Sequence, residues 1–192
     1  MPEAAPAPDE THAQIPFGQF AFDVTFQASG GGDFAPFAAV MDAAVGGFSE
    51  VSGLEATMEP KVIKQGGMNY GAIQRAGPVT FATVVLKRGV ITSRHLWDWW
   101  SYFAGGDGAA NGGWGGGSRC DVTIGLTRDF ETGTGFNIKT ERKVMLGWKM
   151  INAMPIKFKS ADLNARGTEI AIEEIHLVHE GLFGRNVGSP QQ

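Results

Sequence analysis

Apolar and polar side chains alternate along several short segments of this chain, which is the pattern of β-strands with one buried face. In the first segment, Phe20, Phe22, Val24 and Phe26 alternate with polar or small residues, so one face is apolar. Comparable patterns predict further strands near residues 47–58, 79–87, 119–127, 136–140, 142–152, 154–160 and 168–179. The chain is therefore predicted to be rich in strands.

One segment has the spacing of a helix, from about residue 92 to residue 103. Its apolar residues recur three and four positions apart and form one stripe: Leu96, Trp99, Trp100 and Phe103. Thr92 or Ser93 precedes this stripe, and either is a typical N-cap residue. We expect the helix to pack its stripe, Trp100 included, against the sheet.

Many short strands and one helix predict a mainly β (α+β) fold, an antiparallel β-barrel or sandwich with one flanking helix. A length of 192 residues with 43% hydrophobic residues suits a single domain, which we place at residues 17–192. Residues 1–16 are rich in proline and alanine and are predicted to form a flexible tail. The glycine-rich stretch 104–118 predicts a flexible surface loop.

Two short β-prone segments, 61–64 and 68–70, flank a pair of glycines at positions 66 and 67. Glycines between such segments are typical of a tight turn between two antiparallel strands. The pattern predicts a projecting hairpin arm at about residues 55–76.

Charge and cysteine content restrict the functional classes. The formal net charge is −4, and short basic patches interleave with apolar residues at strand spacing, which argues against a dedicated nucleic-acid surface. No apolar run approaches the roughly 20 residues of a membrane-spanning helix, and the first residues lack a secretory signal pattern. We therefore expect synthesis in the cytoplasm.

Cys120 is the single cysteine, which excludes an intrachain disulfide, and it is predicted to be a small buried residue.

Candidate catalytic and metal-binding patterns are weak. His176 and His179 would share one face of a helix, but the β-branched residues around them favour a strand, which sends positions three apart to opposite faces. His95 has no nucleophile motif beside it, and the glycine-rich stretch lacks the lysine of a phosphate-binding loop. We expect no catalytic, cofactor-binding or metal-binding residues and no cofactor.

A set of segments in fixed order covers most of residues 17–183: 20–24, 47–55, 64–69, 86–90, 97–99, 148–157, 162–165 and 172–182. Together they resemble the tail tube family shared by contractile bacteriophages, phage-tail-like bacteriocins and extracellular contractile injection systems. The resemblance implies a structural, non-enzymatic protein that forms hexameric rings, which stack into the inner tube of a phage-tail-like particle. It also implies a sheath protein, a baseplate hub or spike and a terminal cap as partners, and cargo protein or DNA in the lumen.

Within this resemblance, the hairpin arm is the candidate surface for contact between subunits. A narrow ribbon has few residues of its own to bury its apolar side chains, so a neighbouring subunit is expected to cover them. The candidate interface residues are Val62, Ile63, Gly66, Gly67, Met68, Asn69 and Tyr70. Two alternatives stay open: a hairpin folded back on its own barrel, and a different function as a secreted β-sandwich binding module or effector.

Overall fold

The computed structural model describes residues 21–28, 47–105, 119–132, 139–164, 166, 168 and 170–186. The predicted tail at residues 1–16 and most of the predicted glycine-rich loop, residues 106–118, lie outside this part. The described strands are β1 (Phe22–Ala28), β2 (Phe48–Ser52), β3 (Ala56–Met58), β4 (Lys61–Ile63), β5 (Ile73–Arg75), β6 (Val79–Phe81), β7 (Val84–Gly89), β8 (Cys120–Thr132), β9 (Lys139–Lys159), β10 (Ile172–Val178) and β11 (Gly181–Asn186). The described helix is α2 (His95–Ala104).

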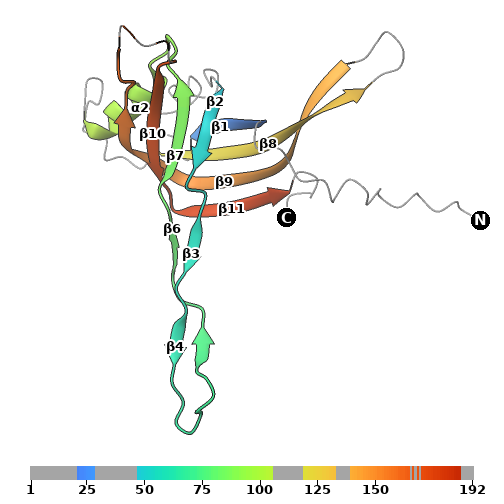
Figure 1. Cartoon of the computed structure of the whole chain (residues 1–192), viewed down its shortest axis with the longest axis vertical. Helices are drawn as coiled ribbons and strands as arrows, with labels where there is room; N and C mark the ends of the chain where they lie inside the picture. The colour runs from blue at the N-terminus through green and yellow to red at the C-terminus, as the bar shows by residue number, and fades with distance from the viewer. Residues whose placement is uncertain are drawn as a thin grey trace, which may run out of the picture.

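The main sheet is antiparallel and curls into a half-barrel (Figure 1). Its strands lie in the order β1-β8-β9-β10-β7-β2, and β11 pairs with β9 beside this path. Helix α2 flanks the sheet, as the apolar stripe predicts. The predicted fold class is confirmed: a mainly β protein with an antiparallel, barrel-like sheet and one flanking helix in its described part. Within that part, no helix is long and apolar enough to cross a membrane.

Strand β9 corrects the prediction of three separate strands between residues 136 and 160. It is one strand of 21 residues, and Asn152, at the end of the predicted strand 142–152, adopts a φ of 51° without ending it. Asparagine tolerates this conformation better than most residues, and here its backbone N–H donates to Oδ1 of Asp121 at 3.1 Å. β9 therefore joins two parts of the sheet, because its first part pairs with β8 and β11 and its last residues pair with β10.

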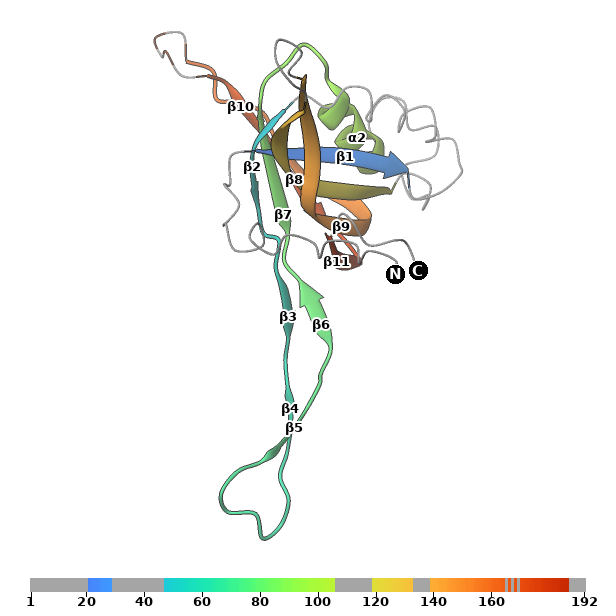
Figure 2. The ribbon, with the colours of Figure 1, turned by 90° about the vertical axis from the view of Figure 1, so that its right-hand side faces the viewer.

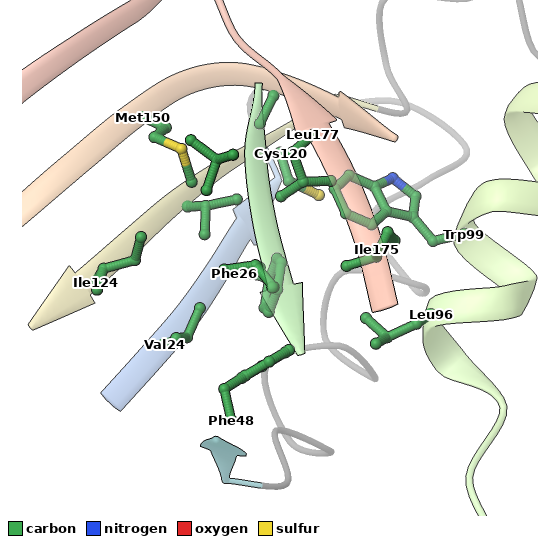
Figure 3. Close-up of a cluster of buried hydrophobic side chains, with 14 residues drawn as sticks. Val24, Phe26, Phe48, Leu96, Trp99, Cys120, Ile124, Met150, Ile175 and Leu177 are labelled. Carbon is green, nitrogen blue, oxygen red and sulfur yellow. The ribbon is translucent and has the colours of Figure 1, made fainter. Parts of the chain in front are cut away.

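The core lies inside the curl, where alternate residues of the strands meet the apolar stripe of α2 (Figure 3). Trp99 is fully buried and meets Phe26 edge to face, with ring centroids 5.8 Å apart. Leu96 is buried too, and Phe103 packs partly buried against the core.

Two predictions for the helix are wrong. Trp100 is only half-buried and packs against Trp97, 5.2 Å between ring centroids, because it lies at the margin of the stripe. The N-cap residue is Arg94, which makes no side-chain capping hydrogen bond, so neither Thr92 nor Ser93 caps the helix.

The burial of Cys120 is confirmed, and burial raises the pKa of its thiol to about 12.

Candidate assembly interface

The chain between β2 and β7 leaves the sheet as a long ribbon, which we call the arm, residues 55–82 (Figure 2). β3 pairs with β6 near the sheet, and β4 pairs with β5 farther out. Both pairs are antiparallel, and the chain turns at the distal end, where the Met68 N–H donates to the Gln65 carbonyl at 3.2 Å. The ribbon contains the residues, about 55–76, at which the sequence predicts a projecting hairpin.

The pairing inside the arm differs from the prediction. The partner of β4 is β5, with Ile63 opposite Ile73, and residues 68–70 lie in the turn region instead of a strand. The physical reason is that a pair of β-branched residues across two strands stabilises a ribbon, whereas Gly66, Gly67 and Gly71 make the intervening segment costly to order as a strand.

The arm begins at residues 53–55 and 82–84, which we call the arm root, and two backbone segments approach each other closely there. Gly53 has a φ of +84°, and a Cβ added there would lie 2.1 Å from the carbonyl oxygen of Thr83. Farther along the arm, between its two strand pairs, a Cβ added at Gly77 would lie 1.8 Å from the carbonyl oxygen of Glu59. The Ala82 N–H also donates to the Glu55 carbonyl at 3.1 Å. The arm therefore leaves the sheet in a direction fixed by main-chain contacts.

Large apolar side chains along the arm face solvent. Val62 is 52% exposed, and Tyr70, at 105%, is not covered by any other described residue. The exposed apolar residues of the arm are Met58, Val62, Ile63, Met68, Tyr70, Ile73 and Val79. Because every residue from 55 to 76 is exposed, the arm does not fold back on its own sheet, and this alternative is wrong.

The distal part of the arm, residues 60–76, is also basic. It contains Lys61, Lys64 and Arg75 and no acidic residue. Lys61 and Arg75 lie directly opposite each other in the β4–β5 pair, a like-charge arrangement that weakens an isolated ribbon. None of the three forms an ion pair within the described part of the chain. The arm thus offers both apolar and positive groups to a partner.

The structure brings together all seven predicted interface residues on this arm. Val62 and Ile63 lie in β4, Gly66 and Gly67 lie in the distal turn, and Met68, Asn69 and Tyr70 follow that turn. Three further exposed apolar residues of the arm, Met58, Ile73 and Val79, were not predicted as interface residues. Met58 and Val79 lie at the ends of the predicted strands 47–58 and 79–87, and the strand that contains Ile73 is only three residues long, which is too short for an alternation pattern to be recognised.

The histidines weighed as catalytic or metal-binding candidates lie in α2, in β10 and directly after β10. His176 lies in β10, as expected for a strand, with Nε2 3.4 Å from Oε2 of Glu174. His179 follows β10 and packs against Phe81 at the arm root, 5.0 Å between ring centroids. Burial lowers the pKa of His179, and the Gly181 backbone acts in the opposite direction. His95 begins α2. Across the described residues, no three His, Cys, Asp or Glu side chains gather where they could hold a metal ion.

Comparison with protein families gives one match that spans most of the chain. The model of the family described as T4-like virus tail tube protein gp19 matches residues 18–183. No curated protein matches the chain.

Several solved structures share the fold. A chain of the PVC sheath–tube complex, from an extracellular contractile injection system in the extended state, has a TM-score of 0.63 at 20% identity, covering 95% of this chain and 100% of that one. A chain of the anti-feeding prophage baseplate has a TM-score of 0.61 at 18% identity, covering 92% and 99%. A chain of the anti-feeding prophage cap has a TM-score of 0.61 at 19% identity, covering 91% and 93%. At these identities the likeness establishes the shared fold.

Proposed function

The chain belongs to the T4-like virus tail tube protein gp19 family, and from this premise we propose that it forms hexameric rings that stack into the inner tube of a contractile, phage-tail-like injection particle. The proposal includes that the chain acts as a structural subunit and catalyses no reaction. The family match favours it over the alternative of a secreted β-sandwich binding module or effector.

The observation that carries the proposal is the exposed apolar arm. A two-stranded ribbon is marginal in water by itself, and this one also places Lys61 opposite Arg75. Covering its apolar side chains with a neighbouring subunit contributes roughly 1.5–3 kcal/mol for each aliphatic side chain that becomes fully buried. The seven predicted interface residues, from Val62 to Tyr70, are accordingly proposed to contact an adjacent subunit.

The edges of the sheet support ring formation. Among the described strands, β1 pairs only with β8, β2 only with β7 and β11 only with β9. Unpaired strand edges are prone to add a strand from another chain. If an edge of one copy meets a different edge of the next, the contact is head to tail, and such contacts close into a ring when the rotation permits.

The proposed partners follow from the particles in which similar folds occur. The similar structures come from a complex of sheath and tube, from a baseplate and from a cap. We propose a sheath, a baseplate hub or spike and a terminal cap as partners of this chain, and a lumen that carries cargo protein or DNA. On this proposal the chain is made in the cytoplasm and leaves the cell only as part of an assembled particle.

Negative-stain microscopy of the purified protein tests the proposal. The wild-type chain is expected to form rings and tubes, whereas the double variant Val62→Asp with Ile63→Asp should stay folded and form no long tubes, because two charges cannot be buried without partners. Circular dichroism and the thermal midpoint establish that this variant is folded.

The matched control exchanges the two residues, Val62→Ile with Ile63→Val, so that the apolar content is unchanged. It should form tubes of normal length. Wild-type protein that stays monomeric at high concentration contradicts the proposed function. Normal tubes from the stable Asp double variant contradict the role of the arm.

A further inference from the structure

His179 lies where the arm meets the body of the sheet. It directly follows β10, and its ring packs against the ring of Phe81 in β6, with 5.0 Å between the centroids. Phe81 is partly buried, whereas every other residue of β3 and β6 is exposed. The ring of His179 therefore contacts the one sheltered residue of these two arm strands.

Both ring nitrogens of His179 are shielded from solvent. Nδ1 and Nε2 are buried, and neither has a partner in hydrogen-bonding geometry among the described residues. A neutral imidazole has one N–H donor, whereas an imidazolium has two donors and a full charge. Because burial of an unpaired charge costs far more than burial of a neutral ring, this arrangement requires the neutral form.

The acidic neighbour of His179 in its own turn is already engaged. Glu180 forms an ion pair with Arg119, and it accepts a hydrogen bond from Nδ2 of Asn152 at 2.8 Å. Its carboxylate is thus committed to β8 and β9 and does not serve as a counter-ion for the ring.

The elements packed beside His179 carry charges that are also engaged. The arm begins with Glu55, which accepts from Oγ1 of Thr57 at 3.2 Å. β9, which pairs with the residue after the turn, carries Lys149, and its Nζ lies 2.8 Å from Oδ2 of Asp121. The pKa of His179 is lowered by burial and raised to a smaller extent by the Gly181 backbone, and neither cause is a charged side chain.

We propose that His179 is a pH-sensitive latch on the arm: its neutral ring holds Phe81 in place, and protonation of the ring releases the arm at its root. A released arm no longer has a fixed direction, so every contact that the arm makes becomes sensitive to acid. The inference goes beyond the proposed function, because it concerns regulation within one chain and needs no second copy.

The direction of the pH effect follows from proton linkage. When the root opens, the ring of His179 meets water and binds a proton with its ordinary pKa of about 6.5. The closed form binds the proton only at lower pH, because burial lowers the pKa of the ring. The open form therefore becomes more populated as the pH falls below about 6.5, by at most about tenfold for each pH unit, until the lowered pKa is reached.

Amide hydrogen exchange followed by NMR measures opening of the root. The probe is the Ala82 N–H, which donates to the Glu55 carbonyl at 3.1 Å and closes the root. The full-length chain with Val62→Asp and Ile63→Asp is used, so that neighbouring copies do not cover the arm. Between about pH 7.5 and about pH 5.5, we expect the protection factor of Ala82 to fall several-fold. The Ile124 amide, in the middle of the sheet, should keep its protection.

Three further variants, made in the same background, assign the effect to one ring. His179→Phe keeps an aromatic contact with Phe81 but does not titrate, and His179→Gln removes both the ring and its charge. Both should show no pH dependence at Ala82. His176→Gln is the matched control, because it removes another histidine from the neighbouring strand β10 and should leave the pH dependence unchanged.

The ring itself provides a measurement that needs no substitution at His179. In an NMR titration, its midpoint should lie below 6.5, and a midpoint at or above 6.5 overturns the proposal. A pH-independent Ala82 amide, or an unchanged pH dependence in the His179 variants, also overturns it.

Motion of the turn alone is distinguishable from release of the arm. The Glu180 N–H donates to the Ile151 carbonyl at 3.0 Å on the other side of His179. Loss of protection there without loss at Ala82 shows that the turn moves and the arm does not, which overturns the latch. These measurements use unassembled chains, so wild-type protein that forms no tubes contradicts the proposed function and leaves the latch standing.

Discussion

At the scale of single residues, the core is organised around Trp99 and a buried ion pair. Arg88 is 2% exposed and its Nε donates to Oε1 of Glu173 at 2.5 Å, which joins β7 to β10 at a point where the two residues are register partners. Arg88 also lies over the ring of Phe48, 5.9 Å from its centroid. The pair was missed at the sequence level, although Arg88 is in phase with the buried Val84 and Leu86.

The contrast between the two neighbouring tryptophans gives a residue-scale prediction. Trp99→Ala should lower the free energy of unfolding by about 3–5 kcal/mol, because it leaves a cavity in the core. Trp100→Ala should cost clearly less, since this side chain is half-buried at the margin of the helix. Denaturant unfolding of both variants measures the difference, and equal losses would show that the two rings are equally important for packing.

At the scale of elements, the long strand β9 and the arm have different roles in the fold. β9 binds the sheet together because it pairs with β8, β10 and β11. The arm extends two neighbouring strands, β2 and β7, away from that sheet. Its direction depends on glycines that allow close backbone approach, above all Gly53 and Gly77.

Substitution of glycines along the arm gives an element-scale prediction. Gly53→Ala should destabilise the arm root by at least about 1 kcal/mol, because its φ is positive and its new Cβ would meet Thr83. Gly66→Ala is the control, since it has open space around it and no positive φ. Limited proteolysis of the arm and the length of assembled tubes provide the measurements. An unchanged Gly53→Ala protein would show that the root can relax without cost.

At the scale of the whole molecule, exposed apolar side chains are concentrated on the arm but are not confined to it. Seven of the fifteen large apolar residues that are exposed in the described part lie on the arm, and the other eight, among them Val90, Ile156 and Phe183, lie on the rest of the molecule. A chain built this way gains stability as it assembles, because burial of these surfaces favours the assembled state.

The glycine-rich stretch gives the prediction for the whole molecule. Replacing residues 105–117 with a short Gly-Ser linker should leave folding and ring formation intact, because loop-closure cost changes slowly with loop length and the stretch has no hydrophobic periodicity. Size-exclusion chromatography and microscopy measure the outcome. Loss of soluble rings would show that Trp114 or a neighbour makes a contact essential for assembly.

The sequence by itself determined the features that depend on local periodicity. Alternation in β1 predicts a strand with one buried face, and the spacing of Leu96 and Trp99 predicts the buried stripe of α2. The pair Gly66-Gly67 between β-prone residues predicts a projecting hairpin. These features follow from side-chain directions within one element, which are the same in every fold.

Only the tertiary structure decided the features that depend on which segments meet. Examples are the pairing of Ile63 with Ile73, the continuation of β9 through Asn152 and the ion pair between Arg88 and Glu173. Strand register and sheet curl arise from contacts between distant segments, and a periodic pattern within one segment contains no information about its partner.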